Sequence, residues 1–307
     1  MVSRRLLACA LLATLVLGGC QRAAQEPVPA AGAPATPSAD PRGPVTKLLV
    51  LVVENHSQDE MRSQMPEAFG LAERYGYATD YRALTHPSLP NYLAMAGGDT
   101  FGVADDDPPT AHVIHGASVF GQAMGAGRTA KVYAEGMPGP CALGTDGERY
   151  AVRHNPWAYF VDERDLCERL DVPLDDFAAD AASGDLPDAG LVVPDLCHDA
   201  HDEGCDLAGA DAWIADHVRA AMDGPDFAAG RLAIVITADE DDHRQDNLVL
   251  TIVVHPSQEG HVVSTPLTHY SLTRLYDQVL GVPALRQAAT APDMAQAFGL
   301  PLPPGQG

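Results

Sequence analysis

Two pairs of oxygen-bearing side chains and one serine have the types that metal-assisted hydrolysis of an ester requires. Glu54 and Asn55 form one pair, Asp239 and Glu240 form the other, and Ser88 lies between them along the chain. Carboxylate and amide oxygens bind divalent cations, and a cation that coordinates a serine oxygen lowers the pKa of the hydroxyl and activates it for attack on phosphorus. These residues therefore indicate nucleophilic chemistry assisted by a divalent metal ion of unspecified identity.

A short segment bounded by cysteines adds a third group of potential ligands. Its histidines and carboxylates are Asp195, His198, Asp199, His201 and Asp202. Mixed sets of histidine and carboxylate suit zinc, manganese or iron, whereas oxygen ligands alone suit magnesium or calcium. The alternative is an exposed loop that carries no ion.

Each of these features also has a purely structural explanation. Ser88 precedes a predicted helix, and a serine in that place commonly caps the helix. An acidic run such as the one that begins at Asp239 is usually a solvated loop, and we expect Asp241 and Asp242 to be solvated. A lone histidine such as His269, which precedes the last long helix, is more often structural than catalytic.

The predicted strands and helices alternate along the chain. Buried apolar runs predict strands at 46–53, 131–133, 189–193, 232–237 and 248–254, and periodic segments predict helices at 66–75, 88–97, 210–222 and 269–280. Such alternation indicates an α/β fold with a mostly parallel central sheet and helices on both faces. Ligands of these sheets gather beyond the carboxyl ends of the strands. Since Glu54 and Asp239 each follow a strand, we expect them to converge with Ser88 on one cation.

Charge and missing motifs exclude several classes of protein. The chain has 42 Asp+Glu against 19 Lys+Arg, a net charge of −23, whereas nucleic acid is bound through clustered basic residues. No GxGxxG follows a strand, and neither a P-loop nor a GxSxG elbow occurs. An acidic protein that acts on phosphate esters needs a metal ion or local donors to offset repulsion. Arg153, His154 and Asn155 offer such donors, or form a surface turn.

The N-terminus resembles a bacterial lipoprotein signal. Arg4 and Arg5 precede an apolar run at 6–17 that is too short to span a bilayer comfortably, and Leu-Gly-Gly-Cys20 follows. We expect a signal peptide at 1–19, a lipidated Cys20 with a Pro/Ala-rich tether at 20–46, a catalytic domain at 47–300 and a flexible tail at 301–307. The protein would then be exported and held by its lipid on the bacterial cell membrane, facing outward or into the periplasm. An ordinary secretory signal is the alternative.

The remaining cysteines fit an oxidising compartment. Outside the signal and Cys20 there are four, an even number that suggests two disulfides. We favour Cys141–Cys167 and Cys197–Cys205, because each pair closes a short loop. A zinc site is the rival, but no CxxC pair occurs.

An ordered set of motifs resembles a known family. The motifs are ENHS at 54–57, THPSLPNYLA at 85–94, MPGPC at 137–141, YAVRHNP at 150–156, PDLCHDAHD at 194–202, DE at 239–240 and HYSL at 269–272. Together they are similar to the bacterial phosphoesterase family of acid phosphatases and phospholipases C, within the alkaline-phosphatase-like superfamily. The resemblance covers residues 47 to about 298.

This resemblance implies roles for individual residues. The implied metal ligands are Glu54, Asn55, Ser88, Asp199, Asp239 and Glu240. Ser88 matches the nucleophile, and His201 and His269 are the candidates for proton transfer. The expected contacts of the substrate phosphate are His86, Asn91, Arg153, His154 and His198. The family often has asparagine where Asp195 and His198 stand, so the metal preference of that segment is open.

The resemblance implies an acid-phosphatase-like phosphomonoesterase. It would be a metal-dependent hydrolase of small phosphorylated substrates that forms a serine phospho-enzyme. One alternative is a phosphodiesterase of the phospholipase C type. Another is a non-catalytic lipoprotein that binds a divalent cation.

Overall fold

The computed structural model describes residues 43–145 and 149–303. The predicted signal peptide, Cys20 and most of the tether lie outside the described residues. Within the described ranges, no helix combines the length and the apolar character that crossing a bilayer requires.

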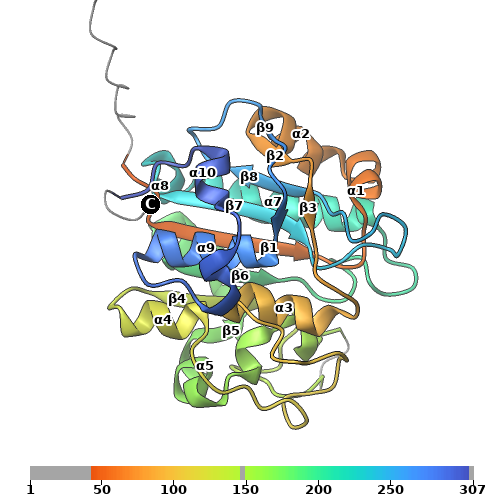
Figure 1. Ribbon diagram of the computed structural model, residues 1–307, viewed down its shortest axis with the longest axis vertical. Coiled ribbons are helices and arrows are strands. Elements are labelled where there is room, and N and C mark those ends of the chain that lie inside the picture. Colours follow the sequence, from red (N-terminus) through yellow and green to blue (C-terminus); the bar gives the residue numbers. More distant parts are fainter. Residues whose placement is uncertain (1–42, 146–148, 304–307) are drawn as a thin grey trace, which may run out of the picture. The chain divides into compact units, whose positions relative to one another are not determined.

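A central sheet of eight strands has the order β5-β4-β6-β1-β7-β8-β2-β9 (Figure 1). All neighbours pair in parallel except β8, which is antiparallel to both β7 and β2. The strands of this sheet are β1 (Lys47–Val53), β2 (Gly76–Ala78), β4 (Ala130–Ala134), β5 (Asp171–Pro173), β6 (Ala189–Val193), β7 (Leu232–Ala238), β8 (Thr251–Val254) and β9 (His261–Val263). Two short strands, β3 (Tyr81–Arg82) and β10 (Leu267–Thr268), form a separate parallel pair. The mostly parallel α/β architecture is thus the one that the sequence predicts.

Helices cover both faces of the sheet. In Figure 1, α9 lies in front of the central strands with α3 and α4 beside it, and α7 lies behind them. The α-helices are α1 (Gln58–Gln64), α2 (Pro66–Arg74), α3 (Ser88–Gly97), α4 (Val119–Gly125), α5 (Arg164–Leu170), α6 (Phe177–Ser183), α7 (Leu207–Asp223), α8 (Pro225–Ala228), α9 (His269–Leu280) and α10 (Met294–Phe298). Short 3-10 turns, among them η1 (Val152–His154) and η2 (Pro156–Tyr159), fill the connections.

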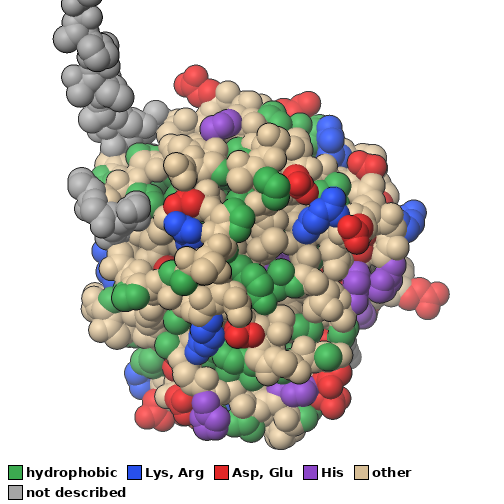
Figure 2. Space-filling model, in the orientation of Figure 1, with side chains coloured by type: hydrophobic (Ala, Val, Ile, Leu, Met, Phe, Trp, Pro, Cys, Tyr) green, Lys and Arg blue, Asp and Glu red, His purple; other side chains and the backbone are tan. Residues whose placement is uncertain are grey.

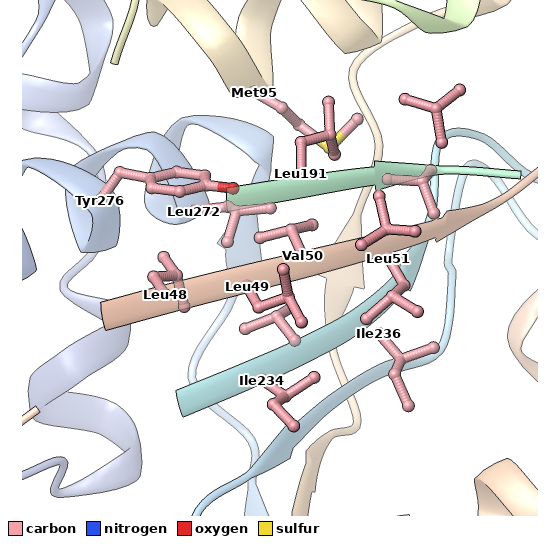
Figure 3. Close-up of a cluster of buried hydrophobic side chains, with 14 of the residues drawn as sticks. Leu48, Leu49, Val50, Leu51, Met95, Leu191, Ile234, Ile236, Leu272 and Tyr276 are labelled. Carbon is pink, nitrogen blue, oxygen red and sulfur yellow. The ribbon is translucent and has the colours of Figure 1, made fainter. Parts of the chain in front are cut away.

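The strand β1 is central because its residues are apolar on both faces. All but the first of its residues are buried, as a parallel strand covered by helices on two sides requires. Figure 3 shows Leu48 and Val50 of β1 among Ile234 of β7 and Leu272 of α9. The hydroxyl of Tyr276 on α9 donates to the carbonyl of Gly190 on β6 at 2.6 Å, which fixes this helix on the sheet.

The predicted elements are present with small shifts at their ends. Helix α7 begins three residues earlier than its periodicity predicts, because the Asp206 carboxylate caps it by accepting from the Gly209 N–H. The strand expected at 248–254 begins only at Thr251. Apart from β4, which the sequence predicts at 131–133, the short elements between 98 and 188 lack a clear period and are not predicted individually. Both predicted disulfides, Cys141–Cys167 and Cys197–Cys205, are confirmed.

A buried carboxyl group on α9 makes stability depend on pH. Burial raises the pKa of Asp277 to about 7, although its Oδ2 accepts from the Leu285 N–H at 2.8 Å. The folded protein therefore binds more protons than the unfolded chain between about pH 4 and pH 7. The free energy of unfolding contributed by this group is highest in acid and falls as the pH rises through this window.

We predict that Asp277→Asn removes this part of the pH dependence, at most about 4 kcal/mol between pH 4 and pH 7.5. Urea unfolding of both proteins across this range measures it, with exposed Asp223→Asn as the control for loss of one charge. An unchanged pH slope in Asp277→Asn would contradict the assignment.

Candidate active site

The carboxyl ends of β1 and β7 bring two acidic groups together. The strands are parallel neighbours with Val53 opposite Ala238, so the residues that follow them meet at the same edge. Glu54 and Asp239 are both fully buried there. The Asn55 N–H donates to Asp239 Oδ1 at 3.0 Å, and Asn55 has a left-handed φ of 55°, which asparagine adopts more readily than most residues. The backbone thus turns sharply at the point where the two carboxylates converge.

Ser88 is the first residue of α3, and its side chain contacts the residues that follow β1. Its hydroxyl donates to Glu54 Oε1 at 2.7 Å and is buried. The N-cap residue is Pro87, and the Ser88 hydroxyl bonds to Glu54 and makes no capping hydrogen bond to the helix. The capping explanation for Ser88 is therefore wrong, and the hydroxyl belongs to the acidic cluster.

His154 lies between two carboxylates. Its Nε2 is 2.7 Å from Glu54 Oε2, and its Nδ1 is 3.1 Å from Asp199 Oδ2. Burial opposes charge on all three groups, but the carboxylates raise the pKa of His154 to about 10, and His154 lowers the pKa of Glu54 to about 2. The Tyr92 ring stacks on the imidazole with centroids 5.0 Å apart. The structure thus gives His154 carboxylate partners, whereas the sequence suggested contact with a phosphate.

The donor set fits a divalent cation. Ligand atoms of Glu54, His154 and Asp199 all lie within 4.8 Å of one another. The close contacts of Glu54 Oε2 and Asp199 Oδ2 with the imidazole lack the directions of hydrogen bonds, and Asp239 Oδ2 also has no hydrogen-bond partner. Buried carboxylate oxygens without partners are costly, and a cation would satisfy them. Burial and the charges of Glu54 and Glu240 raise the pKa of Asp239 well above its usual range, which a cation would reverse.

Glu240, which follows Asp239, is held by residues that flank Ser88 in the sequence. Glu240 Oε2 accepts from Asn91 Nδ2 at 3.0 Å, and Glu240 Oε1 lies 2.9 Å from His86 Nδ1. Burial and the charge of Glu54 raise the pKa of Glu240 to about 8. Asp241 is also buried and contacts His86 Nε2 at 3.1 Å, so the expectation that it is solvated is wrong. Its carboxylate instead closes the turn that follows β7, accepting from backbone N–H groups.

Arg153 and His201 lie at the rim of the cluster. An Arg153 Nη2 donates to His201 Nε2 at 3.1 Å, and the imidazole contacts Asp202 through Nδ1. A third of the His201 side chain is exposed, against 18% of Arg153. This contact orients the guanidinium group beside the buried carboxylates.

The other two predicted histidines have different partners. His269 is fully buried, with Nε2 2.6 Å from the Asp239 carbonyl and Nδ1 3.1 Å from the Tyr81 hydroxyl. Burial lowers its pKa to about 4, so it is neutral and supports the backbone of Asp239. His198 Nδ1 contacts Glu135 Oε2 at 2.9 Å, and its ring stacks on Trp213. Its contacts thus anchor the 195–205 loop.

One charged residue of the site was missed by sequence reasoning. Asp106 Oδ1 accepts from the Leu89 N–H at 2.9 Å, directly after Ser88. Its Oδ2 lies 3.9 Å from Arg153 Nε. The only signal was a run of three aspartates at 105–107, which has no neighbouring strand to indicate a site.

The fold is alkaline-phosphatase-like, with a serine and paired acidic residues at the carboxyl edge of a mostly parallel sheet. Solved structures with this fold include a Vibrio parahaemolyticus protein described as in the alkaline phosphatase superfamily (TM-score 0.56, 12% identity, 78% of this chain and 67% of that one). Another is the PsFucS1 sulfatase from Pseudoalteromonas sp. (TM-score 0.52, 12% identity, 85% of this chain and 72% of that one).

The chain belongs to the Phosphoesterase family, whose model matches residues 61–283. It is therefore an enzyme that hydrolyses phosphate esters. A phosphatidylinositol-3-phosphatase from Mycobacterium tuberculosis is 28% identical over 256 residues, which are 82% of each chain. A phosphate-repressible acid phosphatase from Penicillium chrysogenum is 29% identical over 226 residues, which are 67% of this chain and 52% of that one. The chain spans about half the length of this fungal relative.

We predict that the protein binds a divalent cation and that Asp239→Asn weakens this binding by about tenfold or more, because it removes a ligand charge. Elemental analysis after dialysis and calorimetric titration with zinc or manganese measure it. Asp223→Asn, an exposed site with the same charge change, should bind like the wild type. Equal affinity in all three proteins would contradict the ligand set.

Proposed function

We propose that the enzyme is a metal-dependent phosphomonoesterase that acts through a phosphoserine at Ser88. The observation that carries the proposal is the 2.7 Å hydrogen bond from the Ser88 hydroxyl to Glu54. It lies within a cluster of buried carboxylates in which one oxygen each of Glu54, Asp199 and Asp239 has no hydrogen-bond partner. Glu54, Asn55, Asp239 and Glu240 would hold the cation, and a ligand atom of Asp199 lies within 4.8 Å of one of Glu54. When bound, the cation would lower the pKa of the serine hydroxyl and screen the phosphate charge.

The chain's own residues would perform the remaining tasks. Glu54 orients the Ser88 oxygen by accepting its hydrogen bond, and His154 keeps Glu54 ionised. Arg153, held by His201, offers donors to phosphoryl oxygens at the rim. Attack would form the bond from Ser88 Oγ to phosphorus and break the bond from phosphorus to the ester oxygen. The serine proton, which is hydrogen-bonded to Glu54, would leave through this carboxylate, and a proton would pass to the departing alcohol. Water would then cleave the phosphoserine, releasing phosphate and restoring the Ser88 hydroxyl.

The surface is compatible with small phosphorylated substrates. Figure 2 shows Lys and Arg side chains spread singly over the face in view, with acidic side chains beside several of them. A polyanion needs clustered basic groups. The Mycobacterium tuberculosis relative is named for a phosphorylated lipid head group, so a monoester on a lipid is also a candidate substrate.

We predict that Ser88→Ala lowers kcat for p-nitrophenyl phosphate by at least about 1,000-fold, since it removes the attacking oxygen. Ser63→Ala, an exposed serine on α1, is the matched control and should keep full activity. Near-normal turnover by Ser88→Ala would rule out this nucleophile.

A substrate panel with and without chelator distinguishes the candidate functions. We expect hydrolysis of phosphomonoesters that EDTA abolishes and that added zinc, manganese or magnesium restores. Release of diacylglycerol from phosphatidylcholine vesicles would favour the phospholipase C alternative. Bound metal without hydrolysis of any ester would favour the non-catalytic alternative.

Lipid anchoring through Cys20 stays a prediction, since that residue lies outside the described part of the chain. The two disulfides fit export, because such bonds form and persist in oxidising compartments.

A further inference from the structure

The first turn of α3 has few backbone donors to offer a ligand. The early N–H groups of a helix lack partners inside the helix, and they favour anions. In α3 the third residue is Pro90, which has no N–H, so Ser88 and Leu89 supply the N–H groups of this turn. Because Leu89 directly follows the proposed nucleophile in the first turn of α3, we expect its N–H to face a group bonded to Ser88 Oγ. A phosphoryl group there would direct an oxygen at this donor.

This donor already has an anionic partner in the protein. Asp106 Oδ1 accepts from the Leu89 N–H at 2.9 Å, and Asp106 Oδ2 lies 3.9 Å from Arg153 Nε. The same carboxylate thus faces a backbone donor and a guanidinium group, which are the two kinds of donor that a phosphoryl group would use at this rim.

The loop of Asp106 is held in place by its own contacts. The Tyr159 hydroxyl donates to the Asp107 carbonyl at 3.2 Å, and the Asp107 N–H donates to Asp105 Oδ1. Asp105 also pairs with His112 farther along the loop. About a third of the Asp106 side chain remains exposed, and with Arg153 it borders an open cavity of about 430 Å³. The carboxylate is therefore held at the start of α3 while about a third of the side chain faces solvent.

We propose that Asp106 is an internal competitor for the phosphoryl group, occupying the anion position at the start of α3 until phosphate displaces it. The inference rests on the proposed function, in which Ser88 receives the phosphoryl group. A carboxylate within a few ångströms repels a phosphate dianion strongly, and the repulsion persists if the side chain turns only partly aside. Asp106 would therefore weaken the binding of product phosphate.

A weaker hold on phosphate would suit an enzyme whose product carries the same charge as its substrate. Product release limits many enzymes, and a cation together with Arg153 would otherwise retain phosphate. Asp106 would weaken the binding of any phosphoryl group at this position, the ester included, and would thereby favour release of phosphate.

The test is direct binding of inorganic phosphate to the metal-loaded protein by isothermal titration calorimetry. We expect Asp106→Asn to lower the Kd for phosphate by about tenfold or more, because it removes the charge and keeps the side-chain size. Asp107→Asn makes the same charge change one residue away and should match the wild type. Asp106→Ala serves as a second variant, and circular dichroism checks that each protein is folded.

An equal Kd in wild type and both Asp106 variants would overturn the proposal, as would weaker binding by those variants. An equal decrease in the Kd for phosphate in Asp107→Asn would also overturn the proposal, because the effect would then come from the net charge of the protein. Absence of phosphate binding in every protein would count against it as well. Since the measurement needs no turnover, its failure is distinct from that of the proposed function, which Ser88→Ala and the ester panel test.

Discussion

Repulsion among buried carboxylates is the constraint on which this site depends. Glu54, Asp199, Asp239 and Glu240 lose most of their contact with water. Burial, followed by nearby charges of like sign, raises the pKa of Asp199, Asp239 and Glu240. The imidazolium of His154 is the compensating charge that the structure provides at their centre. A carboxylate cluster that one imidazolium balances only in part still attracts a cation. The surrounding hydrogen bonds are best understood as the means of holding these groups together.

The scaffold meets this constraint with rigid backbone. The parallel pairing of β1 with β7 fixes Glu54 opposite Asp239, and the Asn55 N–H closes the gap between the strand ends. Hydrogen bonds between buried polar groups favour one arrangement of the cluster. His269 contributes from the opposite side by supporting the Asp239 carbonyl as a neutral ring. The acidic edge is therefore built mainly from the ends of β1 and β7 and the start of α3, and connecting segments add the buried His154 and Asp199.

The sequence predicts the parts of the site that follow strong periodic elements. Glu54 and Asp239 could be identified because each follows an unbroken apolar strand, and Ser88 because it begins a helix that Pro90 permits in its first turn. Asp106 could not be predicted, since its place beside Leu89 depends on an irregular loop without a periodic signal. The partners of His154 and His269 were equally hidden, because residues distant in sequence surround each ring. The burial of Asp241 could not be predicted either, since it contacts His86, which is distant in the sequence.

The disulfide between Cys197 and Cys205 gives the site a dependence on where the chain matures. It closes the loop that carries Asp199, whose carbonyl also accepts from the Glu54 N–H at 3.0 Å. Thiols stay reduced in the cytosol, so a newly made chain has this segment open until it reaches oxidising surroundings. Recombinant production in a reducing compartment would thus yield a protein without the Cys197–Cys205 disulfide, and oxidative refolding would be needed to form it.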